Sequence, residues 1–134
     1  MTVRASILAN AKGTVEAISG IEQVEAGKWS EVALKDLNLP AAFIILGPDE
    51  VATGPAGFES FWLPAVVEVW CKESDMEALI GSVHAAMLAD ETRGGNAINT
   101  VRDTCVPFAV DPARGLVGFD LTFKILYRHP VGSP

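Results

Sequence analysis

The sequence predicts an α+β fold in which an antiparallel, mixed-order sheet of four to five strands carries two helices on one face. Three observations support this prediction. Two segments repeat apolar residues at helical spacing, several others alternate apolar and polar residues as strands do, and hairpin-like links join neighbouring strands. The expected order is helix, a short optional strand, two strands, helix and two strands. A chain of 134 residues corresponds to a single domain over 1–134.

The two predicted helices are amphipathic. The first covers residues 3–18 and ends before Gly20, and the second begins near Ser74 and ends near Asp90. Their apolar residues recur at three- and four-residue steps: Val3, Ile7, Leu8, Ala11, Val15 and Ile18 in the first, and Met76, Leu79, Ile80, Val83 and Met87 in the second. Each helix therefore has one face to bury against the sheet.

Four segments are rich in β-branched and aromatic residues and are predicted as strands. They are residues 41–47, 63–71, 100–110 and 116–128, with residues 21–25 as a candidate for a short fifth strand. The turn DPARG joins the last two predicted strands, and Pro112 and Gly115 occupy positions at which such a turn favours proline and glycine. The last strand alternates most clearly, with Val117, Phe119, Leu121, Phe123, Ile125 and Tyr127 on one face.

The opposite face of the sheet is also expected to be apolar. Its predicted residues are Ile44, Leu46, Val66, Trp70, Val106, Phe108, Val110 and Leu126. Such a face is covered either by the loops of the same chain or by another subunit, and both alternatives stay open.

Two long connections, residues 26–40 and 47–62, and a short C-terminal tail, residues 129–134, complete the domain. Connections of this length in a small domain usually have a function. The first contains Trp29, and the second contains Phe58, Phe61 and Trp62, so we interpret the second as an extended flap that becomes ordered against a partner.

The net charge of −7 is concentrated in the middle of the sequence, where nine acidic residues and only Lys72 lie between Asp49 and Glu91. The sequence contains no basic stripe, which excludes adhesive binding to nucleic acid. One interpretation is a solvated acidic face. The other is an acidic wall that lets a polyanion pass without binding it.

No sequence motif predicts catalysis, a cofactor or a metal site, and we expect no enzyme activity. Asp103 and Cys105 share a predicted strand face, but nothing places His84 within their reach. Cys71 and Cys105 match no metal or redox spacing and are expected to be reduced. The longest apolar run is too short to span a membrane, and no signal peptide is recognised.

The order of these elements resembles the tail terminator, or tail completion, proteins of long-tailed bacteriophages and phage-like particles. The residues that carry the resemblance are NLPAAFIIL (38–46), AVVEVWCK (65–72), MLADETRGGNA (87–97) and FDLTFKILYRHP (119–130). The closing Tyr127-Arg128 and the pair Gly94-Gly95 followed by Asn96-Ala97 are the most specific parts.

The resemblance implies a structural virion protein that forms a hexameric ring at the head-proximal end of the tail tube. Such a ring ends tube polymerisation, joins the head or neck, lets DNA pass without specific binding and is assembled in the host cytoplasm. Its partners would be further copies of itself, the tail tube protein and a head-completion or neck protein, with no membrane. The last strand and the apolar sheet face are candidate contacts between copies.

The resemblance also assigns hypothetical roles to single residues. The candidate interface residues are Trp29, Phe58, Phe61, Trp62, Trp70, Tyr127 and Arg128, and the candidate acidic lining of the channel is Asp49, Glu50, Glu59, Asp90 and Glu91. Two alternatives remain. One is a head-tail connector or neck completion protein, and the other is a dimeric ferredoxin-like domain with a small-molecule pocket bordered by Trp70, His84 and Tyr127.

Overall fold

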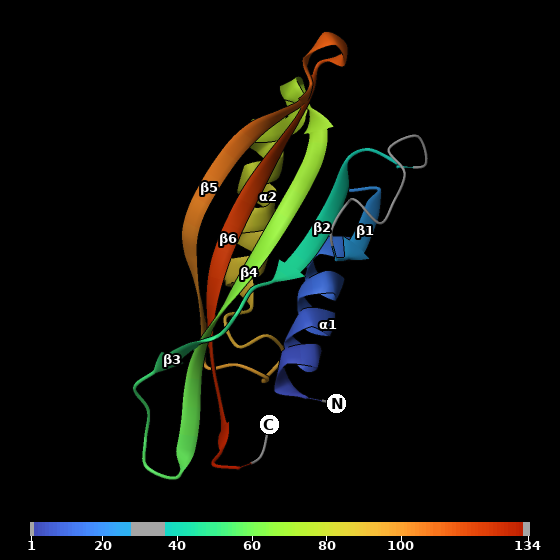
Figure 1. The fold of residues 1–134 in the computed structure, drawn as a ribbon. Coiled ribbons are helices and arrows are strands. Elements are labelled where there is room, and N and C mark those ends of the chain that lie inside the picture. The colour runs from blue at the N-terminus through green and yellow to red at the C-terminus, as the bar shows by residue number, and fades with distance from the viewer. Residues whose placement is uncertain (1, 28–36, 133–134) are drawn as a thin grey trace.

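The computed structural model describes residues 2–27 and 37–132 (Figure 1). Its elements are α1 (Val3–Glu16), β1 (Gln23–Ala26), β2 (Ala41–Leu46), β3 (Glu50–Ala52), β4 (Phe58–Lys72), α2 (Met76–Ala89), β5 (Asn99–Asp111) and β6 (Leu116–Pro130), with short 3-10 turns at Glu73–Asp75 and Pro112–Arg114. The predicted α+β class is confirmed. Both helices and the closing pair of strands lie within a few residues of their predicted positions.

The sheet has six strands in the described residues, where four to five were expected. Its order is β1-β2-β4-β6-β5, and β3 also pairs with β4. Strands β1 and β2 are parallel, whereas all the other neighbours are antiparallel. The long strands β4 and β6 pair over their whole length, from Phe58 opposite Pro130 to Lys72 opposite Leu116. This ribbon forms the centre of the molecule.

Both helices pack on one face of the sheet, as predicted (Figure 1). The odd-numbered residues from Leu63 to Cys71 in β4 and from Phe119 to Tyr127 in β6 are buried on the face that carries the helices. The main cluster includes Val67, Val69, Leu121 and Phe123 from the sheet and Val15, Val83 and Met87 from the helices, and a second cluster joins Ile7 to Leu63, Ala65, Ile125 and Tyr127. The alternating apolar side chains of the strands are therefore buried against the apolar faces of the two helices.

Half of the predicted loop 47–62 is sheet, which corrects the interpretation of a flap that becomes ordered only on a partner. Strand β3 pairs with Ser60–Trp62, and β4 already begins at Phe58. We call β3, residues 58–62 of β4 and residues 126–130 of β6 the arm. The tip of the arm extends beyond the ends of both helices (Figure 1). Gly54, Pro55 and Gly57 form the turn between β3 and β4, where Gly57 has a φ of +88°, and Gly47 and Pro48 lie between β2 and β3.

The last strand is not an edge of the sheet, which corrects its assignment as a candidate for pairing between subunits. Strand β6 lies between β4 and β5, and most of its length is paired on both sides. The long edge strand is β5, whose pairing with β6 is interrupted by a bulge between Arg102 and Cys105. The bulge reverses the alternation of side chains within β5, so Asp103 and Cys105 do not follow the single parity expected from sequence.

The face of the sheet away from the helices differs in part from the prediction. Ile44 and Leu46 point toward the helices, because β2 pairs Ile44 with Val67 and Leu46 with Ala65. Phe43 takes their place on the far face, where it is fully buried with its ring edge against Trp70. Val106 remains 54% exposed on the same face. The far face is therefore covered near β2 and open near β5.

Candidate interaction surface

The arm carries a concentration of exposed apolar side chains. Val51 on β3 is 85% exposed, and Phe58 and Val131 at the tip are 45% and 65% exposed. Val131 is held at the tip by a bond from its N–H to the Gly57 carbonyl, 3.0 Å. The guanidinium of Arg128 lies 5.9 Å from the centroid of the Phe58 ring, within cation–π range. The structure thus brings together two predicted interface residues, Phe58 and Arg128, on an exposed tip.

The other aromatic residues of the arm stabilise the arm itself. Phe61 lies 5.5 Å from the ring centroids of both Tyr127 and His129, and the His129 ring is nearly parallel to it. Tyr127 is only 3% exposed, and Trp62 is partly buried. Their rings therefore offer little surface in the single chain, and Trp29 lies outside the described residues.

Asp49, one of the predicted channel acids, joins the arm to α1. Its carboxylate accepts hydrogen bonds from the Arg4 guanidinium and from the Tyr127 hydroxyl, the latter at 2.6 Å. Arg4 also donates to the Gly47 carbonyl at 3.3 Å. Burial, together with the neighbouring carboxylate, raises the pKa of Tyr127 to about 12. Asp49 is thus engaged within the chain and fixes the base of the arm.

Asp90, another predicted channel acid, holds the turn after α2. It accepts hydrogen bonds from the Gly94 N–H at 2.8 Å, from the Thr92 hydroxyl at 3.2 Å and from the Asn10 amide at 3.4 Å. Partial burial alone would raise the pKa of Asp90, but these donors and the nearby Arg93 cation lower it. Of the five predicted acids, Glu50 and Glu91 are exposed, and Glu59 is partly exposed near His129.

Arg93 is a structural residue that the sequence analysis missed. Its side chain is fully buried, and its guanidinium donates to the carbonyls of Met87 and Asp90 at the end of α2. Burial lowers the pKa of this guanidinium. Its φ of +49° is unusual for a residue with a Cβ. The only signal in the sequence is an arginine directly before two glycines at the C-terminal end of a helix, where a cation interacts favourably with the helix dipole.

Two carboxyl groups lie opposite each other on the far face. Glu68 of β4 pairs in register with Asp120 of β6, and the Trp70 indole N–H donates to Glu68 at 3.1 Å. Burial, followed by the neighbouring Asp120, raises the pKa of Glu68 from 4.5 to about 7, whereas the bond from Trp70 acts to lower it. Glu68 therefore keeps its proton to a higher pH than an ordinary glutamate does.

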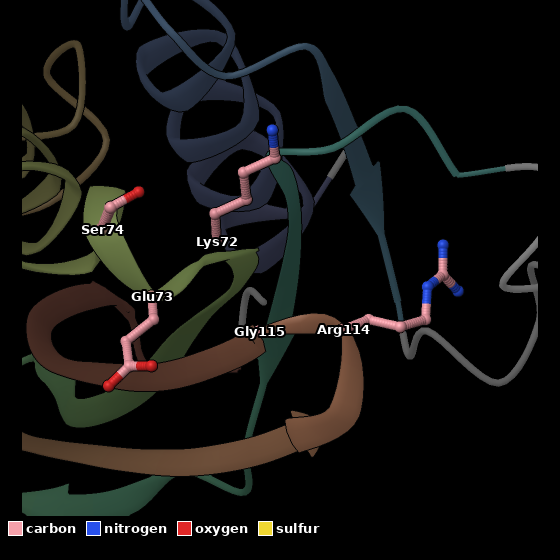
Figure 2. A pocket seen from close by; sticks show the side chains of 5 residues that line it. All are labelled: Lys72, Glu73, Ser74, Arg114 and Gly115. Carbon is pink, nitrogen blue, oxygen red and sulfur yellow. The ribbon is translucent and has the colours of Figure 1, made fainter.

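The surface pockets do not bring side chains together in a way that would form a binding or catalytic site. A hollow of about 490 Å³ is lined by Lys72, Glu73, Ser74, Arg114 and Gly115. Figure 2 shows that the charged ends of its lysine, glutamate and arginine point away from one another. Within residues 2–27 and 37–132, no three His, Cys, Asp or Glu side chains are grouped to hold a metal ion.

The residues considered for catalysis or for a small-molecule pocket are not assembled. The ring of His84 contacts the Arg102 guanidinium, with 3.4 Å between the two nitrogens. Trp70 and Tyr127 point to opposite faces of the sheet. In the part of the chain that the structure describes, no helix has the length and apolar character needed to cross a bilayer.

Comparison with known proteins gives similarities to solved structures. No family model matches the chain, and no curated protein matches it. Among solved structures, a chain of the virion of a native gene transfer agent particle is similar, with 15% identity and a TM-score of 0.42. The alignment covers 95% of this chain and 92% of that chain.

Proposed function

We propose that the protein is a structural subunit of a phage-like virion, and that its copies close into a hexameric ring at the head-proximal end of the tail tube. The observation that carries this proposal is the arm, a three-stranded extension with exposed apolar side chains at its tip. Exposed apolar groups on a rigid projection are costly to leave in water and are typical of protein–protein contacts. The resemblance in element order to tail terminator proteins supplies the particular assembly.

In this proposal the arm tip binds the tail tube protein and stops further polymerisation. Phe58 and Val131 provide the apolar contact, and Arg128 supplies a cation beside the Phe58 ring. The opposite surface of the ring binds a head-completion or neck protein, and DNA passes through the channel without specific contacts. Glu50, Glu59 and Glu91 are the remaining candidates to repel the DNA backbone, since Asp49 and Asp90 are bound within the chain. The protein has no catalytic role, and its place is in the virion.

Native mass spectrometry over a wide range of concentrations tests the ring. A sixfold species supports the proposal, whereas a monomer at every concentration or a dimer that persists on dilution contradicts it. A dimer would favour the ferredoxin-like alternative.

Addition of the protein to polymerising tail tube protein then distinguishes a tail terminator from a neck connector. A terminator shortens the tubes and remains at one end, and Phe58→Ala is expected to weaken this activity at least tenfold. Glu77→Ala, on the exposed side of α2, is the control. A protein that forms rings but binds only the neck protein would be a connector.

A further inference from the structure

Strand β6 has an open edge in the arm. On one side it pairs with β5 only as far as Leu126, which lies opposite Asn99, and then continues toward the tip of the arm beside β4 alone (Figure 1). The last bond on the β5 side runs from the Ile98 N–H to the Leu126 carbonyl, 2.7 Å. Residues 127–130 of β6 therefore have one side without a strand partner in the part of the chain that the structure describes.

The main-chain groups of Arg128 point to this open side. Along a strand paired with antiparallel neighbours, the N–H and C=O of successive residues point alternately to the two sides. The Leu126 carbonyl bonds on the β5 side, so the N–H and C=O of Arg128, two residues later, point to that side as well. Among the described residues neither group has a hydrogen-bond partner there. An extended chain beside β6 can therefore both donate to Arg128 and accept from it.

A surface pocket of about 280 Å³ borders the open edge. Its lining combines the loop before β5 with one residue of β6: Gly95, Asn96, Ala97, Ile98 and Arg128. Bonds within the loop hold it away from β6, since the N–H groups of Gly95 and Ala97 both bond to the Thr92 carbonyl, at 3.0 and 2.8 Å. The space beside the strand is thus left for another chain.

Arg128 gives this edge its chemical preference. It is the one charged residue in the pocket lining, it is exposed, and no carboxylate of the described residues lies within ion-pair distance of it. Its contact with the face of the Phe58 ring leaves its N–H donors available. A carboxylate from outside the chain would form charge-assisted hydrogen bonds with this guanidinium. Ile98, which is 37% exposed in the same lining, suits an apolar neighbour.

We propose that the β6 edge at residues 127–130 binds an extended segment of a partner protein that carries an acidic side chain facing Arg128. The segment adds a strand to the arm, its carboxylate binds the guanidinium, and an apolar side chain beside it covers Ile98. A peptide fits this edge better than a nucleic acid, because a phosphate backbone has acceptors for the guanidinium but no donor for the Arg128 carbonyl. The inference rests on the proposed function, in which the arm binds another virion protein, and it specifies the chemistry of that partner.

The added strand is short. Pro130 has no N–H, so the bonds available on this side are limited to those of Arg128 and the carbonyl of Pro130. One such contact binds weakly, and several copies held in a ring would bind a symmetric partner far more tightly than one copy does.

A synthetic peptide of strand-forming sequence tests the site. The probe is acetyl-Thr-Val-Glu-Val-Thr-amide, titrated at millimolar concentrations into isotope-labelled protein and followed by NMR, and two control peptides carry glutamine or lysine in place of the glutamate. We expect the acidic peptide to bind about fivefold more tightly than the glutamine peptide and to slow solvent exchange of the Arg128 amide hydrogen. Absence of any change at Arg128, or equal binding of the three peptides, would overturn the proposal.

Two arginine variants separate a specific role of Arg128 from general charge. Arg128→Gln removes the cation but keeps a polar side chain, and it is expected to abolish the preference for the acidic peptide. Arg114→Gln removes an exposed cation from the turn before β6, away from the arm, and should leave the preference unchanged. Circular dichroism shows whether each variant is folded. A preference that persists in folded Arg128→Gln would contradict the assignment.

Peptides methylated on main-chain nitrogens test whether the segment binds as a strand. One form is methylated at the glutamate and the other at both valines, so each loses the donors that point to one side of an extended chain. One form should bind about fivefold more weakly than the other. Equal binding of both forms and the unmodified peptide would show contact through the side chain alone and would overturn strand addition.

The outcomes are distinct from those that test the ring. A sixfold species in native mass spectrometry together with no peptide binding would overturn this inference and leave the proposed function intact. A monomer at every concentration would overturn the proposed ring even if the peptide bound. A single-stranded oligonucleotide that displaced the acidic peptide at equal concentration would overturn the assignment to a protein partner in favour of a phosphate contact.

Discussion

Replacement of Glu68 by glutamine is expected to stabilise the folded protein at pH 8 and to leave its stability nearly unchanged at pH 4. In the folded protein, burial and then the Asp120 carboxyl raise the pKa of Glu68 from 4.5 to about 7. Between these values the folded chain binds more protons than the unfolded chain. The protonated carboxyl therefore contributes stability that is fully present below about pH 4.5 and is lost as the pH rises through about 7.

The magnitude follows from the difference between the two pKa values. A change from 4.5 to about 7 corresponds to at most about 3 kcal/mol of unfolding free energy. Glu68 is only partly buried, so solvent screening reduces the expected effect to about 1 kcal/mol. Glutamine keeps an acceptor for the Trp70 indole N–H but carries no charge beside Asp120.

Urea unfolding at pH 4 and at pH 8 measures the effect. Glu77→Gln is the control, because Glu77 is exposed on the first turn of α2. If Glu68→Gln changed the unfolding free energy equally at both pH values, the assignment of a raised pKa to this carboxyl would be refuted.

Three further predictions concern the core and the base of the arm. Arg93→Met should lower the unfolding free energy by about 2 kcal/mol, because two buried carbonyls at the end of α2 lose their donor, and a loss in urea unfolding below ~0.5 kcal/mol would contradict this role. Gly118→Ala would place a Cβ in steric conflict with the Phe108 ring, so its expected cost of about 1–2 kcal/mol should shrink in a Phe108→Ala background, and an additive double-mutant cycle would argue against the contact. The absorbance of the chain's single tyrosine, Tyr127, should titrate at about pH 12, and Asp49→Asn should lower its pKa; an unchanged midpoint would exclude the carboxylate as a cause.

Local patterns in the sequence predicted the elements well. The first helix was expected over residues 3–18 and is observed at Val3–Glu16, and the last strand was expected over 116–128 and is observed at Leu116–Pro130. The turn before that strand uses Gly115 at a φ of +67°, as its sequence indicated. These features depend on spacing and turn chemistry within a few residues, which a single sequence contains.

The features that the sequence did not predict depend on contacts between distant segments. The central position of β6 follows from its pairing with both β4 and β5, and alternation within a strand does not identify its neighbours. The bulge after Arg102 likewise changes which face each later residue of β5 occupies. Asp49 was interpreted from its charge alone, yet its position beside Arg4 and Tyr127 makes it part of the packing.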